Sequence, residues 1–79
     1  MTAIEITNAI HQAIKISYLI DYIEETDTLI FKYIIGATPY TMEFKGITDI
    51  KTKKELNNFI NVIQSDIAYH QKEQEQEKE

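Results

Sequence analysis

Residues 28–45 read TLIFKYIIGATPYTMEFK, two alternating runs of residues on either side of a Gly-Ala-Thr-Pro segment. Successive side chains of a β-strand point to opposite faces, so this alternation predicts strands at about 28–35 and 40–45. The segment 36–39 predicts the turn between them. One face of this hairpin would carry the large apolar side chains of Leu29, Phe31, Tyr33, Ile35, Tyr40, Met42 and Phe44.

Helical periodicity replaces this alternation on both sides of the hairpin. Thr2-Ala3-Ile4-Glu5 has the form of a capping box, and apolar residues then recur on one helical face, which predicts a helix over 3–13. Thr52-Lys53-Lys54-Glu55 has the same form and predicts the start of a second helix over about 52–70. The apolar stripe of this second helix consists of Leu56, Phe59, Ile60, Ile63 and Ile67.

Residues 15–23 allow two interpretations. Ile16, Tyr18, Ile20 and Tyr22 alternate with other residues, as in a strand, but several of these apolar residues also continue the stripe of the first helix. We prefer the strand because Glu24 and Glu25 would oppose the dipole at a helix C-terminus. The sequence 22–31 also has two apolar arms around a polar turn, as in a hairpin.

These elements together predict a single small α+β domain over 1–70. The order would be α-β-β-β-α, with a three-stranded antiparallel meander and both helices on one face. The alternative is α-β-β-α with a long first helix. Residues 71–79 are acidic and of low complexity, and we expect them to form a helix end or a disordered tail.

Length and charge limit the functions that are open to the chain. It has 79 residues, no cysteine and a net charge of −5, and all eight of its basic residues are lysine. Arginine is the usual ligand of phosphates and guanine edges, so general nucleic-acid binding is disfavoured and a basic protein partner is favoured. No apolar run is long enough to span a membrane, and no secretion signal is recognisable, so we expect a cytoplasmic protein.

Catalytic and metal-binding groups are scarce. His11 and His70 are the only imidazoles, and they lie in different predicted helices with no nucleophile at a recognisable spacing. A metal site needs several converging ligands, which this pattern does not provide. We therefore expect no enzyme activity, no metal and no cofactor.

Two surface features are candidates for binding a protein. Glu24, Glu25 and Asp27 lie in the first predicted hairpin turn, and Glu43 lies on a strand, so these acids could meet basic groups of a partner. The strand face opposite the helices would expose Leu19, Ile23, Ile30 and Ile34, and exposed apolar patches often mark interfaces.

One stretch of the chain resembles the double-stranded-RNA-binding domain. The resemblance lies in the element order, in Pro39-Tyr40-Thr41-Met42-Glu43-Phe44 and in Thr52-Lys53-Lys54-Glu55, with Lys51 beside the second motif. It implies phosphate contacts by these lysines at the start of the second helix. The Gly-Pro-His turn of that family is missing, and the net charge has the opposite sign.

In size, charge and topology the chain is similar to small acidic inhibitors that phages and mobile elements use against host nucleases, including some type II anti-CRISPR proteins. This similarity implies a non-enzymatic protein that binds a larger, basic partner with carboxylates in place of phosphates. The alternative is a homo-oligomeric structural or accessory protein, a homodimer in the simplest case, with the apolar strip as its own interface.

Overall fold

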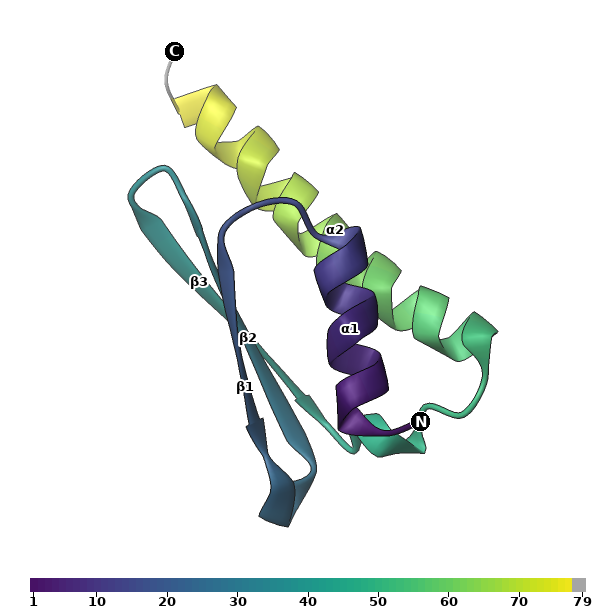
Figure 1. Cartoon of the computed structure of the whole chain (residues 1–79). Helices are drawn as coiled ribbons and strands as arrows, with labels where there is room; N and C mark the ends of the chain where they lie inside the picture. The colour runs from purple at the N-terminus through teal and green to yellow at the C-terminus, as the bar shows by residue number, and fades with distance from the viewer. Residues whose placement is uncertain (78–79) are drawn as a thin grey trace.

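The computed structural model describes residues 1–77 and shows the predicted order α-β-β-β-α (Figure 1). Helix α1 (Ala3–Ala13) is followed by the antiparallel strands β1 (Tyr18–Ile23), β2 (Thr28–Ile35) and β3 (Thr38–Lys45), and then by helix α2 (Lys53–Glu77). Short 3₁₀ helices occupy the β1–β2 turn (η1, Glu24–Thr26) and the link to α2 (η2, Ile47–Asp49). Strand β2 is central, so β1 and β3 are the two edges.

Both helices lie on one side of the sheet, which we call the inner face (Figure 1). Strand pairing aligns Ile20 with Phe31 and Phe31 with Met42, so the large apolar residues of all three strands share this face. The face opposite the helices is called the outer face. The predicted α+β meander with both helices on one face is confirmed, and the long first helix is wrong because α1 ends at Ala13.

The helix starts follow the predicted capping chemistry. The Thr2 hydroxyl accepts a hydrogen bond from the Glu5 amide at 3.2 Å, and the Glu5 carboxylate accepts one from the Thr2 amide at 3.1 Å. At α2 the Thr52 hydroxyl accepts from the Glu55 amide at 3.1 Å. These bonds satisfy amides that a helix leaves unpaired at its N-terminus.

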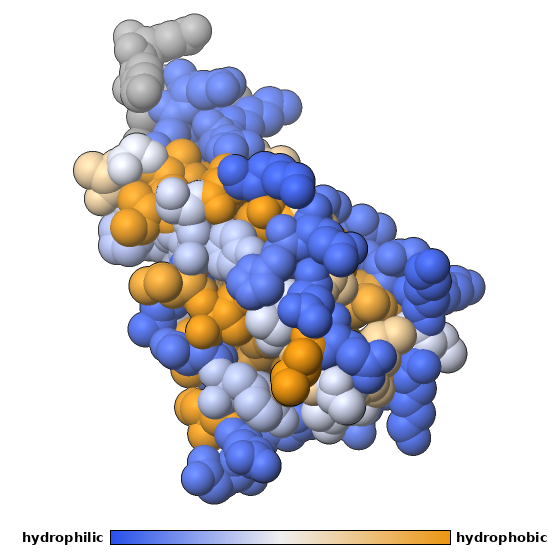
Figure 2. Space-filling model, in the orientation of Figure 1, coloured by the Kyte–Doolittle hydropathy of each residue, from blue (hydrophilic) through white to orange (hydrophobic). Residues whose placement is uncertain are grey.

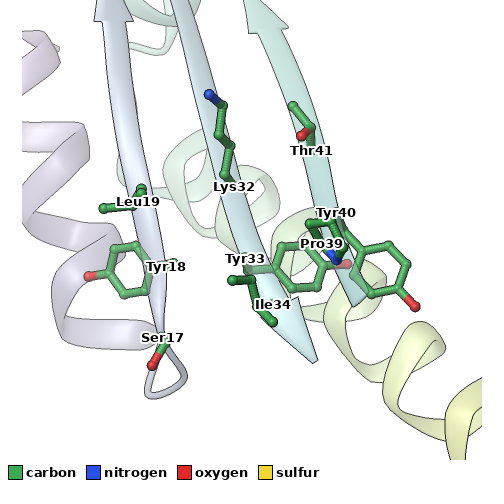
Figure 3. A pocket seen from close by; sticks show the side chains of 9 residues that line it. All are labelled: Ser17, Tyr18, Leu19, Lys32, Tyr33, Ile34, Pro39, Tyr40 and Thr41. Atoms are coloured by element: carbon green, nitrogen blue, oxygen red, sulfur yellow. The ribbon is translucent and has the colours of Figure 1, made fainter. Parts of the chain in front are cut away.

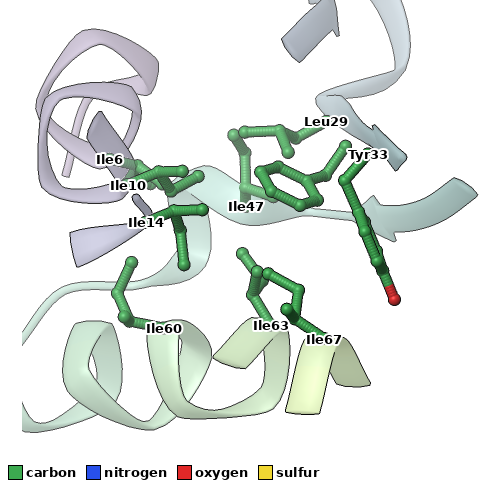
Figure 4. Close-up of a cluster of buried hydrophobic side chains, with 10 residues drawn as sticks. Ile6, Ile10, Ile14, Leu29, Tyr33, Ile47, Ile60, Ile63 and Ile67 are labelled. Carbon is green, nitrogen blue, oxygen red and sulfur yellow. The ribbon is translucent and has the colours of Figure 1, made fainter. Parts of the chain in front are cut away.

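The hydrophobic core is a layer between the sheet and the two helices (Figure 4). Leu29 and Phe31 from β2 and Ile63 from α2 have no exposed surface. The 3₁₀ helix η2 contributes Ile47, which the sequence pattern did not single out. The remaining buried apolar residues are Ile6, Ile10, Ile14, Tyr33, Ile60 and Ile67.

The turn between β2 and β3 differs from expectation. The turn is confined to Gly36 and Ala37, because Ile35 pairs with Thr38, and Pro39 is therefore part of β3. Gly36 adopts φ +63, the left-handed region that favours glycine in tight hairpins. Helix α2 continues to Glu77, so residues 71–77 of the acidic segment are helical, while 78–79 lie outside the described residues.

Replacing Ile63 by alanine should lower the free energy of unfolding by about 2–5 kcal/mol, because the site is fully buried between the helices and the sheet. Val62, its neighbour in α2, is 52% exposed, and Val62→Ala should change the stability by less than about 0.5 kcal/mol. Urea denaturation followed by circular dichroism measures both. Equal losses for the two variants would contradict the placement of α2.

Candidate interaction surface

The outer face of the sheet is built from rows of side chains across the three strands. Strand register places Leu19 beside Lys32 and Lys32 beside Thr41. The next row in the direction of the β1–β2 turn joins Asp21, Ile30 and Glu43. At the other end of the sheet Ile34 lies opposite Pro39. Each of these residues alternates along its strand with residues that point to the inner face, so the strand pairing that forms the core also places them on the outer face.

Apolar side chains on this face are open to solvent. Leu19 is 72% exposed, Ile34 is 56% exposed and Ile23 is 40% exposed. Figure 2 shows apolar groups in orange among hydrophilic groups in blue over the strands, whereas hydrophilic groups cover the visible C-terminal part of α2. The sequence-predicted strip of Leu19, Ile23, Ile30 and Ile34 thus shares one face, with Ile30 half-buried.

A shallow hollow of about 340 Å³ lies at the end of this face near the β2–β3 turn. Figure 3 shows Leu19, Ile34 and Pro39 around it, with Lys32 and Thr41 on the same face. The side chains of Tyr18, Tyr33 and Tyr40 point to the inner face from the neighbouring positions. The hollow therefore offers an apolar floor and an ammonium group to a partner. Sequence reasoning missed Pro39 because it placed this residue in the turn.

The charges on the outer face balance each other. Asp21 and Glu43 carry two negative charges, and Lys32 and Lys45 carry two positive charges. Lys32 Nζ lies 3.8 Å from Asp21 Oδ2, and both side chains are more than half exposed, so this pair contributes little to stability. The excess of acids lies elsewhere on the chain.

The carboxylates of the first hairpin have two different environments. Glu24 and Glu25 lie on η1 and are exposed. Asp27 follows them with φ 50, and its carboxylate accepts hydrogen bonds within the chain: from the Tyr22 hydroxyl at 2.5 Å, and from the amide and hydroxyl of Thr48 at 3.0 and 2.6 Å. Asp27 therefore joins the β1–β2 turn to η2, while Glu24 and Glu25 are available to a partner.

These bonds change two ionisation equilibria. Hydrogen bonds from the Thr48 hydroxyl, then from the Tyr22 hydroxyl, lower the pKa of Asp27 below its ordinary value. The same contact raises the pKa of Tyr22 to about 12, because the Asp27 carboxylate accepts the phenol proton and repels a phenolate. The native state thus favours a charged Asp27 beside a neutral Tyr22.

The pH dependence of stability follows from the sign of the Asp27 shift. Its pKa in the folded state lies below the ordinary value of 3.8, so its stabilisation is complete above 3.8 and is lost as the pH falls through the folded-state pKa. Asp27→Asn should unfold at a lower temperature than wild type at neutral pH, and the difference should shrink in acid. Thermal melts from pH 7 to pH 2 measure this. A constant difference across the range would exclude the Asp27 carboxylate as the cause.

The two histidines are held by tyrosines of the inner face. His11, exposed on α1, is hydrogen-bonded through Nδ1 to the Tyr18 hydroxyl, and their ring centroids are 5.6 Å apart. His70 Nδ1 lies 2.7 Å from the hydroxyl of buried Tyr33. Each imidazole thus contacts the strand layer beneath it.

The Tyr33 hydroxyl also contacts Asp66, at 2.6 Å. Because a carboxylate can only accept, this hydroxyl donates to Asp66 and accepts from His70 Nδ1–H. Burial, followed by the bond to Asp66, raises the pKa of Tyr33. His70 stacks on Tyr40 with ring centroids 3.9 Å apart. The network ties α2 to β2 and β3, and sequence reasoning, which placed His70 at the end of the core, did not find its partners.

The part of the chain from residue 1 to residue 77 has no group of three or more His, Cys, Asp or Glu side chains that could hold a metal ion. No helix within it is long and apolar enough to cross a membrane. Lys51, Lys53 and Lys54 are exposed at the start of α2.

Comparison of the chain with protein-family models, with curated proteins and with solved structures gives no match.

Proposed function

We propose that this chain is a non-enzymatic binding protein that docks its outer sheet face and its hairpin carboxylates on a larger protein. The partner would present apolar groups to Leu19, Ile30 and Ile34, and basic groups to Glu24, Glu25 and Glu43. The observation that carries the proposal is the exposure of Leu19 and Ile34 around a hollow on a face that neither of the described helices covers.

The surface has the parts of a protein interface. Exposed aliphatic side chains supply contact area that is removed from water on binding. The hollow beside Ile34 and Pro39 can receive one side chain of a partner, and such anchored residues dominate the energy of many interfaces. Glu24 and Glu25 lie beyond the far end of β1 from this hollow, where they can steer the approach of a basic surface.

The net charge of the chain favours a partner protein with a basic surface. With a net charge of −5 and no arginine, the chain is repelled by polyanions and attracted by basic surfaces. Proteins that handle nucleic acids carry such surfaces for phosphates. A small acidic protein seated there blocks nucleic-acid binding, which is the action of a phage or mobile-element inhibitor of a host defence protein. This extension to an inhibitor rests on charge and size.

Affinity purification from the cells that produce the protein tests the proposal. Tagged wild type should retain a partner that is lost with Ile34→Ser and weakened about tenfold by the pair Glu24→Gln and Glu25→Gln. Titration calorimetry with the purified partner should show weaker binding at high salt, because exposed charges are screened. Nucleic acid should compete with the chain for this partner.

The matched control removes the same number of negative charges from another part of the surface. Glu73 and Glu75 are exposed on the C-terminal part of α2, and Glu73→Gln with Glu75→Gln should leave binding unchanged. A partner that is lost equally with both charge pairs would indicate a nonspecific attraction. Retention of every captured protein by Ile34→Ser would exclude the outer face as the binding surface.

A further inference from the structure

Strand β1 is an edge of the sheet whose outward backbone groups have no hydrogen-bond partner among the described residues. Its sequence YLIDYI contains no proline, glycine or lysine, and Asp21 is its only charged residue. The other edge, β3, carries Pro39, Glu43 and Lys45. Proline and charged residues are the features with which edge strands resist pairing with another chain. Strand β1 therefore has fewer of these features than β3, and it is the edge better suited to accept a further strand.

The flank of α1 beside β1 carries one large exposed apolar side chain. His11 contacts Tyr18 of β1, so the side of α1 that carries His11 faces this edge. Ile4 lies seven residues before His11 and hence on the same side of the helix, and it is 73% exposed. The opposite flank, with Ala9 and Ala13, faces α2. Exposed apolar side chains therefore lie on both faces of this edge. Ile4 of α1 lies on the inner side, and Leu19 and Ile23 of β1 itself point to the outer side.

We propose that β1 pairs antiparallel with β1 of a second copy of this chain, so that two three-stranded sheets join into one of six strands. The two copies would be related by a twofold axis perpendicular to the sheet. Their helices would lie on one side, with the two α1 flanks adjacent, and their outer faces would form one continuous surface on the other side. This inference does not depend on the proposed function, and it doubles the surface that a partner meets.

The side chains of β1 select one register for this pair. Directly opposite residues of two antiparallel strands point to the same face of a sheet. The two inner faces therefore lie on the same side only if the axis passes midway between one residue of β1 and the same residue of the second copy. An axis at Leu19 leaves only three residues of β1 to pair, since the strand begins at Tyr18. An axis at Asp21 places two aspartates directly opposite each other, which is destabilising. An axis at Ile20 pairs five residues and sets Tyr18 opposite Tyr22 of the second copy.

Charges at the two ends of β1 fit an antiparallel pair. Such a pair brings the loop before β1, which carries Lys15, towards η1 of the second copy, which carries Glu25, and symmetry repeats this approach. Both side chains are exposed in the single chain and are therefore accessible to a second copy. The register centred on Ile20 sets Asp21 opposite Leu19 of the second copy and so keeps the two aspartates from lying directly opposite each other. A second copy therefore meets complementary charges at the ends of this edge, although each chain is acidic overall.

Sedimentation equilibrium from micromolar to millimolar protein tests the dimer. Leu19→Asp places an aspartate opposite Asp21 of the second copy, twice by symmetry, and should weaken the dimer about tenfold. Leu19→Lys makes the opposite pairing and should leave the dimer intact. Thr41→Asp, in the same row but on the β3 edge, is the matched control and should have no effect. Circular dichroism shows whether each variant is folded.

A charge exchange tests the antiparallel arrangement of the two β1 strands. Lys15→Glu alone and Glu25→Lys alone should each weaken the dimer, and the double variant should recover it. A monomer at every concentration would overturn the proposal, as would failure of the double variant to recover the dimer. Dissociation by Thr41→Asp and Ile34→Asp would also overturn it, since contact would then be face to face. Partner capture by wild type is measured separately, so loss of the dimer leaves the proposed function standing.

Discussion

The burial of Leu29, Phe31 and Tyr33 beneath the two helices is the constraint on which the rest of the structure depends. These three residues lie on the inner face of the central strand, and none is more than 1% exposed. Because β2 alternates strictly, burying them on one side commits Ile30, Lys32 and Ile34 to the other. A chain of this length has two helices with which to cover a sheet, and both are used on one face.

One-sided covering explains why the outer face has a mixed character. The core contains five isoleucines from the helices, Ile14 directly after α1 and Ile47 from η2, and the chain has further aliphatic residues that this single layer cannot hold. Small domains bury a smaller fraction of their surface than large ones do, so some of these residues reach solvent. Among the described residues, Leu19, Ile23 and Ile34 are exposed on the outer face beside charged side chains, and Ile4, Val62 and Tyr69 are exposed on the helices. The proposed docking role uses this mixed, charge-balanced character of the outer face.

Periodicity was sufficient to predict the parts of the fold that depend on neighbouring residues. The strand alternation placed every inner-face residue from Tyr18 to Phe44 on the correct side, and the two Thr-x-x-Glu motifs located the helix starts. The extent of the β2–β3 turn was missed because strand pairing through Thr38 and Pro39 depends on register. Helix α2 extends beyond Ile67, the last residue of its apolar stripe, and hydrophobic periodicity cannot predict where a helix ends in a segment without apolar residues.

The candidate site was predicted in part for the same reason. The apolar strip follows from alternation, so Leu19, Ile23, Ile30 and Ile34 could be identified in advance. The engagement of Asp27 with Thr48 joins residues that are distant in sequence, as does the contact of Tyr33 with Asp66 and His70. No local pattern encodes such contacts. The exposure of Ile4 likewise depends on how α1 turns toward β1 and α2.

The central claim is that the outer face is an interface, and thiol labelling of Ile34→Cys tests it most directly because the chain has no cysteine of its own. The account predicts fast labelling in dilute purified protein and strong protection inside the cells that produce the protein. Asn57→Cys, at an exposed position of α2, should label equally in both settings. Equal labelling of Ile34→Cys in the two settings would contradict the claim that this face is covered in use.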